Sequence, residues 1–269
     1  MQTQEKPDTS GTPNTQDARR QAIKADFIAR RGYWAPWHEG LLALNPEFLN
    51  AYLGMTSLAW TDGVLEPKVK EFIYVAIDAA TTHLYLRGLR LHIGTALQYG
   101  ATQAEIMEVL QIVSQLGWHT CSVGVPILAD ELRKAGLGEA VDAPLAPSAL
   151  ALKQKFEADL GYWDDCCENL ARIAPAFLEA YYQFSANAWT SSVLEPKVKE
   201  FIALSVSAST THLHEAGMRM HIRRAIACGA TPREIMEVLQ LTSVLGIHTC
   251  SIGVPIFTEE LARAGTPVV

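Results

Sequence analysis

The sequence predicts an all-α protein built from two tandem copies of one domain, each copy containing roughly six helices. Three observations lead to this prediction. A segment of about 105 residues occurs twice, apolar residues recur at helical spacing, and no run alternates between polar and apolar residues over the length of a strand.

The duplication is seen most directly in the decapeptide VLEPKVKEFI, which occurs at Val64–Ile73 and again at Val193–Ile202, an offset of 129 residues. When residues 32–136 are aligned with residues 161–265 without a gap, 58 of the 105 positions are identical. A repeat of this length indicates a duplicated domain rather than a solenoid of short units.

The duplication sets the expected domain boundaries. We expect a first domain over residues 18–137 and a second over residues 152–269, joined by a linker over residues 138–151 that contains two prolines. Residues 1–17 are polar and rich in Thr, Pro and Gln, which predicts a disordered tail.

Three helices of the first copy can be placed in order. The first is expected at Lys68–Ala80, where the apolar residues form one stripe and Pro67 suits the first turn. The second is expected at Leu84–Tyr99, ending before Gly100. Thr102 and Glu105 then form a capping box for a third helix that continues to about Leu116.

Composition excludes several classes of protein. Apolar residues make up 49% of the chain and charged residues 19%, which is ordinary for a globular protein. The net charge of −7 without a basic run argues against nucleic-acid binding, and no apolar stretch reaches 18 residues, so no membrane span is expected. The absence of a signal peptide and five cysteines without CxxC spacing favour a cytoplasmic protein.

Histidines provide the first candidate site. His214, Gly217 and His221 are spaced three and four residues apart, which predicts one face of a helix; the first copy has Tyr85, Gly88 and His92 at these positions. A mid-helix glycine costs about 1 kcal/mol relative to alanine. It therefore leaves room beside the histidine, either for a small ligand or for close packing of a neighbouring helix.

Glu71 and Glu200 lie one predicted helix before these histidines. A carboxylate that orients a histidine is typical of acid–base catalysis, whereas an isolated glutamate on a helix is usually solvated. Glu215 follows His214 and is replaced by Leu86 in the first copy, so the second copy is the more polar and is favoured as the active one.

The remaining reactive side chains point away from nucleophile or metal chemistry. His119 and Cys121, two residues apart on a predicted helix, face different directions, which favours Cys121 as a packing residue, and adjacent Cys166 and Cys167 are expected to be packing residues too. No HExxH or CxxC spacing is present, so no metal site is expected.

One run of the sequence resembles the carboxymuconolactone decarboxylase family, which includes the alkylhydroperoxidase D-like proteins. It reads His92-x3-Ala-x3-Gly-Ala-Thr-x2-Glu-Ile-x-Glu-Val-Leu, and it recurs from His221. The match covers nearly all of both copies. The resemblance implies an all-helical fold and ring-like assemblies of single domains, so a chain with two copies would form a homotrimer with a pseudo-hexameric arrangement.

The thiol branch of this family has the pattern E-x11-C-x2-C-x3-H. Counting back from His92 and His221, the two cysteine positions hold Tyr85 and Gly88 in the first copy and His214 and Gly217 in the second. A peroxidase that works through a disulfide would therefore lack its nucleophile here.

The decarboxylase branch, which also lacks the cysteine pair, resembles the chain better. The resemblance implies decarboxylation of a small carboxylated lactone from aromatic-acid breakdown, without a cofactor. The residues carried over as catalytic are His221, His92, Glu200 and Glu71. The polar neighbours expected to bind the substrate are His212, His214, Glu215, His83 and Tyr85. Other acid–base or peroxide chemistry and a non-catalytic binding or scaffold subunit remain as alternatives.

Overall fold

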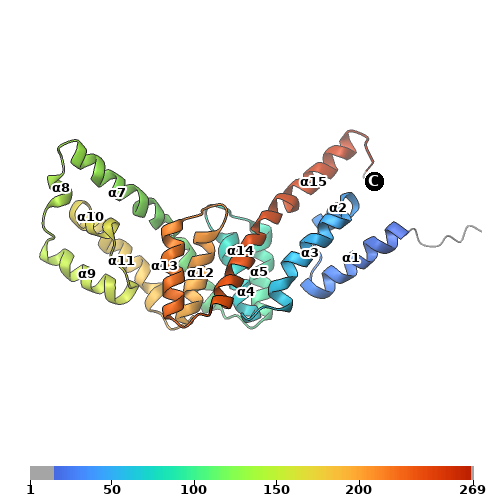
Figure 1. Cartoon of the computed structure of the whole chain (residues 1–269), viewed down its shortest axis with the longest axis horizontal. Coiled ribbons are helices and arrows are strands. Elements are labelled where there is room, and N and C mark those ends of the chain that lie inside the picture. Colours follow the sequence, from blue (N-terminus) through green and yellow to red (C-terminus); the bar gives the residue numbers. More distant parts are fainter. Residues whose placement is uncertain (1–14, 268–269) are drawn as a thin grey trace, which may run out of the picture. The chain divides into compact units, whose positions relative to one another are not determined.

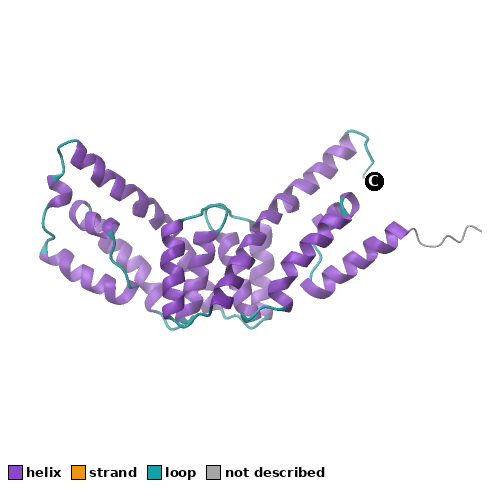
Figure 2. Ribbon diagram, viewed as in Figure 1, coloured by secondary structure: helices purple, strands orange, loops and turns teal. Residues whose placement is uncertain are grey.

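A computed structural model describes residues 15–267, and these residues contain helices and loops without any strand (Figure 2). The all-α prediction is therefore confirmed for the described chain. Contacts divide the chain into two compact units, the first comprising Met1–Gly63 with Gly246–Val269 and the second Val64–Leu245.

The second unit carries most of the residues singled out by the sequence. Its elements, most of them labelled in Figure 1, are α4 (Pro67–Ala79), α5 (Leu86–Gln98), α6 (Gln103–Ser114), η1 (Gln115–Gly117), α7 (Trp118–Lys134), α8 (Glu139–Asp142), α9 (Pro147–Leu160), α10 (Asp165–Ile173), α11 (Pro175–Thr190), α12 (Pro196–Ala208), α13 (Glu215–Ala227) and α14 (Pro232–Ser243).

The three helices predicted in the first copy correspond to α4, α5 and α6. Thr102 accepts a hydrogen bond from the Glu105 amide and the Glu105 side chain accepts one from the Thr102 amide, so the predicted capping box is present. Thr231 and Glu234 form the same box before α14. The second predicted helix is shorter than expected, because Leu84 adopts a positive φ of 50° and the helix begins only at Leu86.

Helices of the two sequence copies pack against each other in the second unit. Helix α4 packs on α12 and α14, and α12 packs on α6, while α7 lies against α10. Two buried ion pairs connect the copies: Lys199 Nζ lies 2.7 Å from Glu108 Oε1, and Lys70 Nζ lies 3.1 Å from Glu237 Oε1. Removing one partner of a buried pair leaves an uncompensated charge, so these contacts hold the copies together in one defined arrangement.

The first unit consists of α1 (Thr15–Arg31), α2 (Pro36–Leu44), α3 (Pro46–Thr61) and α15 (His248–Arg263), with η2 (Val244–Ile247) at its boundary. Its core includes Phe27, whose ring centroid lies 4.4 Å from that of the fully buried His38. Burial lowers the pKa of His38 to about 4, and its Nδ1 accepts a hydrogen bond from the Ala35 amide. His38 is therefore a neutral packing residue.

The compact units do not coincide with the two sequence copies, because the boundaries of the units fall inside each copy at Gly63 and Gly246. The predicted linker, residues 138–151, contains α8 and the beginning of α9. Of the predicted tail, residues 1–14 lie outside the described residues, and residues 15–17 belong to α1.

One stretch, Pro232–Arg263, is long and apolar enough to cross a membrane by length and composition. It comprises α14, η2 and α15 rather than one regular α-helix, and it contains Glu237, the buried partner of Lys70. The expectation of no membrane span therefore stays a prediction from the sequence.

Candidate functional site

The centre of the candidate site is a hydrogen bond between His221 on α13 and Glu200 on α12, two helices that pack along each other. His221 Nδ1 lies 2.8 Å from Glu200 Oε2, and the two residues are only 5% and 2% exposed. Because a carboxylate accepts, Nδ1 donates, which fixes the tautomer of the ring and leaves Nε2 to exchange a proton with a ligand. The structure thus brings together the pair that the sequence predicted for the second copy.

Arg224, one helical turn after His221, binds the other oxygen of the same carboxylate. Its Nε lies 2.8 Å from Glu200 Oε1, another guanidinium nitrogen donates to the Leu160 carbonyl at 2.6 Å, and the guanidinium lies 4.7 Å from the Trp189 ring centroid. Three contacts hold this cation beside the histidine. The sequence analysis missed Arg224, although its position three residues after His221 places it on the same helical face.

A cavity of about 60 Å³ opens beside this group. Both sequence copies contribute to its wall, which also contains the aromatic pair Trp118 and Tyr181, stacked with centroids 3.9 Å apart. His221 and Arg224 line it together with Ser207. The cavity therefore presents a proton-transferring group and a cation among largely apolar walls, as small-molecule sites commonly do.

A second hollow of about 240 Å³ lies on the other side of Arg224 and Trp189, which line both spaces. Glu200 and the backbone near Gly161 form part of its wall. Arg224 therefore contributes to the walls of both the small cavity and this larger hollow.

His214 is not on the helical face that its spacing predicted. It is the N-terminal capping residue of α13, and its Nδ1 accepts a hydrogen bond from the Gly217 amide at 3.0 Å. A Cβ atom added at Gly217 would lie 2.7 Å from His214 Nδ1 and 2.8 Å from Ser207 Oγ. The glycine is thus required for close packing of neighbouring side chains, which decides between the two interpretations left open by the sequence.

His119, at the start of α7, joins the histidines of the second copy. Its Nδ1 lies 2.5 Å from His212 Nε2, and its ring stacks on that of His214 with centroids 3.7 Å apart. Burial, reinforced by the neighbouring histidines, lowers the pKa of His119 to about 3, and burial also lowers the pKa values of His212 and His214. All three rings are therefore neutral at neutral pH. The sequence analysis missed this role of His119.

The matching residues of the first copy form a different site. His92 Nδ1 lies 2.7 Å from Glu71 Oε2, so this predicted pair is also formed. The Tyr74 ring stacks on His92 with centroids 4.5 Å apart, and the Asp78 carboxylate lies 4.0 Å from His92 Nε2. Burial, with a contribution from Glu71, raises the pKa of Asp78 to about 8.

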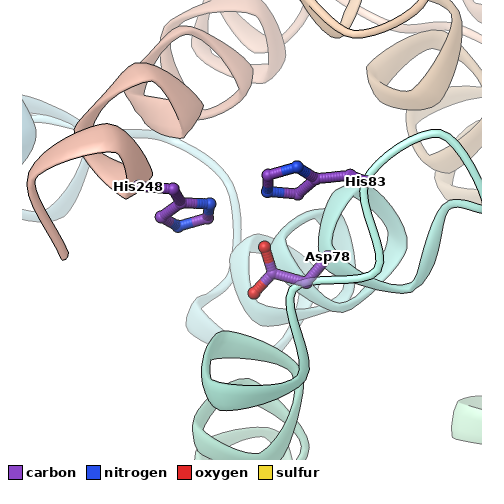
Figure 3. Close-up of side chains that lie close together, drawn as sticks. All are labelled: Asp78, His83 and His248. Carbon is purple, nitrogen blue, oxygen red and sulfur yellow. The ribbon is translucent and has the colours of Figure 1, made fainter. Parts of the chain in front are cut away.

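Figure 3 shows Asp78 on α4 and His83 in the turn that follows this helix; the third labelled residue, His248, belongs to the other compact unit. The His83 ring centroid lies 5.8 Å from that of Tyr85, and burial lowers the pKa of His83. The predicted binding residues of the first copy therefore lie near each other, next to a buried acid that the sequence analysis did not identify.

Glu215 does not join the site. Its side chain is 72% exposed and bonds to Arg219 one turn later at 2.6 Å. It occupies the first turn of α13, where a carboxylate favours the positive end of the helix. The chain turns at His214 and directs the two adjacent side chains to different environments, so substrate binding by Glu215 stays a prediction from the sequence.

Cysteine chemistry receives no support from the described residues. Cys166 and Cys167 are buried in the core of the second unit, and burial raises the pKa of Cys166 to about 12 and that of Cys167 further. Neither is a thiolate at neutral pH, which confirms their interpretation as packing residues.

Comparisons with known proteins agree with this description. The model of the carboxymuconolactone decarboxylase family matches residues 46–119 and 175–246, one segment in each sequence copy. A crystal structure of a "putative gamma-carboxymuconolactone decarboxylase subunit" from Burkholderia xenovorans LB400 is 39% identical and superposes with a TM-score of 0.87, covering 91% of this chain and 98% of that one. No curated protein matches the chain. The two matched segments and this likeness show that the chain is a tandem-duplicated member of the carboxymuconolactone decarboxylase family.

Proposed function

We propose that the protein is a cofactor-independent decarboxylase of a small carboxylated lactone and that the second copy carries the activity. The observation behind this proposal is the buried His221–Glu200 pair, which lies on the wall of a small cavity next to a cation. Family membership and the description of the similar Burkholderia protein support the same reaction class.

The reaction makes modest demands on the protein. The bond between the carboxylate carbon and the lactone carbon breaks, and CO2 leaves. The electron pair of that bond moves into the conjugated lactone. One proton must then be added to the carbon skeleton. The site therefore has to orient the substrate carboxylates and deliver a proton, both of which polar side chains can do.

His221 is suited to deliver the proton. Its Nδ1 is bonded to Glu200, so a proton taken up at Nε2 produces an imidazolium whose charge is stabilised by the carboxylate. Arg224 balances the charge of Glu200 and keeps the carboxylate in place. In this arrangement Glu200 is a positioning residue and His221 is the catalytic acid or base.

Arg224 is also the group best placed to attract the substrate. A cation shared by the small cavity and the larger hollow offers hydrogen bonds to a carboxylate in either space. The small cavity lies below the range of about 300 to 1,000 Å³ usual for ligand pockets, so it would hold only the part of a carboxylated lactone that reacts.

Thiol-dependent peroxide chemistry is a weaker alternative. The positions of the family's cysteine pair hold His214 and Gly217 in the second copy, where the histidine caps α13 and the glycine allows close packing. The two buried cysteines of α10 are protonated at neutral pH. The geometry therefore favours proton transfer by histidine over attack by a thiolate.

The test is an assay of the purified full chain with γ-carboxymuconolactone, in which loss of the lactone and release of CO2 are followed together. The His92→Ala, His221→Ala double variant is the control. We expect turnover by the wild type and none by the variant. Turnover that persists in a well-folded double variant would overturn the assignment of the histidines, and no turnover by the wild type would overturn the proposed substrate. A lactone that only raises the thermal stability would instead support a binding subunit.

A further inference from the structure

The second-copy site contains residues from the first sequence copy. Helix α7 belongs to the first copy, and its first turns place His119 and Ser122 against the turn that precedes α13. His119 Nδ1 lies 2.5 Å from His212 Nε2, and Ser122 Oγ lies 3.4 Å from His214 Nε2. Both histidines of the second copy are thus in contact with α7.

The turn that carries these two histidines has a strained backbone. Leu213, between them, has a positive φ of 50° although it is neither glycine nor asparagine, and its side chain is 60% exposed. Such a conformation is unfavourable for leucine and persists only where the surroundings determine it. The contacts of His212 with His119 and of His214 with Ser122 are part of those surroundings. The rings of His212 and His214 themselves lie 5.7 Å apart.

The hydrogen bonds also fix which nitrogen of His214 can meet a ligand. Nδ1 accepts from the Gly217 amide, so the neutral ring carries its proton on Nε2. The stacked His119 ring covers one face of the imidazole and leaves its edge. This Nε2–H group, which lies a long 3.4 Å from Ser122 Oγ, is a hydrogen-bond donor for a carboxylate.

We propose that His119 is a positioning residue for the active site of the second copy, holding His212 and His214 as neutral donors to a substrate carboxylate. This inference rests on the proposed decarboxylase function. It adds that the site is assembled from both copies of the duplication, so the second half of the sequence cannot bind substrate fully by itself. His119 lines the same cavity as His221, and His214 lies close enough to His221 for that histidine to contribute to the lowering of its pKa.

The first experiment separates this role from a general effect on folding. His119→Ala is expected to raise KM for the lactone about tenfold, the equivalent of one lost hydrogen bond, with a smaller change in kcat. The matched control is His248→Ala, which changes the duplicate His-Thr-Cys sequence on α15 and is expected to leave both constants unchanged. Equal effects of the two variants, or an unchanged KM for His119→Ala, would overturn the proposal.

A second variant covers the case in which His119→Ala does not fold. His119→Phe keeps a ring stacked on His214 but removes the hydrogen bond to His212. We expect KM to rise by a smaller factor than for His119→Ala. A wild-type KM in this variant would show that the bond to His212 has no part in substrate binding.

The third measurement does not depend on turnover. Imidazole nitrogen NMR of the ligand-free full chain should show His214 as the neutral Nε2–H form, titrating below the ordinary pKa of about 6.5. The ionisable groups that face it are His119, His212 and His221. His119→Ala exposes the ring to water, so its pKa should rise toward the ordinary value, while His248→Ala should not change it. An unchanged titration in His119→Ala would contradict the positioning role even if the lactone is not the substrate.

Discussion

The two copies carry the same histidine–glutamate pair in different surroundings. In both, Nδ1 of the histidine is bonded to the glutamate of the preceding long helix. In the second copy, Ala203 and Ser207 of α12 line the cavity beside His221. In the first, Tyr74 stacks on His92 and Asp78 approaches its Nε2. The duplicated pair therefore lines a cavity beside a cation in one copy and lies beside Tyr74 and Asp78 in the other.

This difference has a physical cause in a few substitutions. Tyrosine in place of alanine stacks on the histidine ring, and a buried acid in place of serine lies 4.0 Å from its Nε2. Arg224 of the second copy corresponds to Thr95 in the first, so the cation beside the glutamate is also missing there. An anionic ligand should therefore prefer the second copy on both steric and electrostatic grounds.

Next to the loss of His221 itself, the largest effect is expected at Glu200, the carboxylate that positions this histidine. Glu200→Gln keeps the shape of the side chain but removes the charge that stabilises a protonated His221. We expect kcat to fall about a hundredfold, within the range for loss of acid–base assistance. The matched change Glu71→Gln in the first copy should leave kcat near the wild-type value. Equal losses would show that both copies are active, and steady-state kinetics with the lactone decides between these results.

A smaller effect is expected for the cation. Arg224→Thr gives the second copy the residue of the first and should raise KM about tenfold or more, because a hydrogen bond to a charged group is lost. Arg219→Thr, on the exposed side of the same helix where Arg219 pairs with Glu215, serves as the control and should leave KM unchanged. A wild-type KM for Arg224→Thr would remove Arg224 from the binding site.

The smallest effect on activity, and a distinct effect on stability, is expected at Asp78. Its pKa in the folded protein is about 8, above the value near 3.8 of an ordinary aspartate. Between these two pH values the folded state holds a proton that the unfolded state releases. The contribution of Asp78 to the free energy of unfolding therefore declines as pH rises from about 4 to 8.

Asp78→Ser introduces the residue of the second copy and removes this pH dependence. The variant should gain stability over the wild type at pH 9 relative to pH 5, measured by urea unfolding at both values. Ser207→Ala in the second copy is the control, since it changes no ionisable group. A stability difference between Asp78→Ser and the wild type that is the same at both pH values would contradict the protonated state of Asp78.

Much of the fold could be predicted from the sequence, because its signals are local. The capping boxes at Thr102 and Thr231 and the apolar stripe of α4 depend only on neighbouring residues, and the duplication made each signal available twice. The turn before α5 could not be predicted in this way. Leu84 and Leu213 adopt positive φ values that their residue type disfavours, which shortened α5 and α13 relative to expectation.

The candidate site was predicted only in part, for the same reason. The pairs His221–Glu200 and His92–Glu71 follow from two helices that are adjacent in the sequence and pack together. His119 meets His212 across 93 residues, and no local pattern reports such a contact. Nor does a local pattern report that Glu215 pairs with Arg219 apart from His214, because a capping residue and the first residue of a helix face different directions.

The most direct test of the central claim compares His221→Ala with His92→Ala in the full chain. The claim is that the His221–Glu200 pair of the second copy performs the reaction and the His92–Glu71 pair of the first does not. We expect His221→Ala to lower kcat for the lactone about a thousandfold, within the range for a general acid or base, and His92→Ala to leave it near the wild-type value. A loss confined to His92→Ala, or equal losses in both variants, would contradict the account.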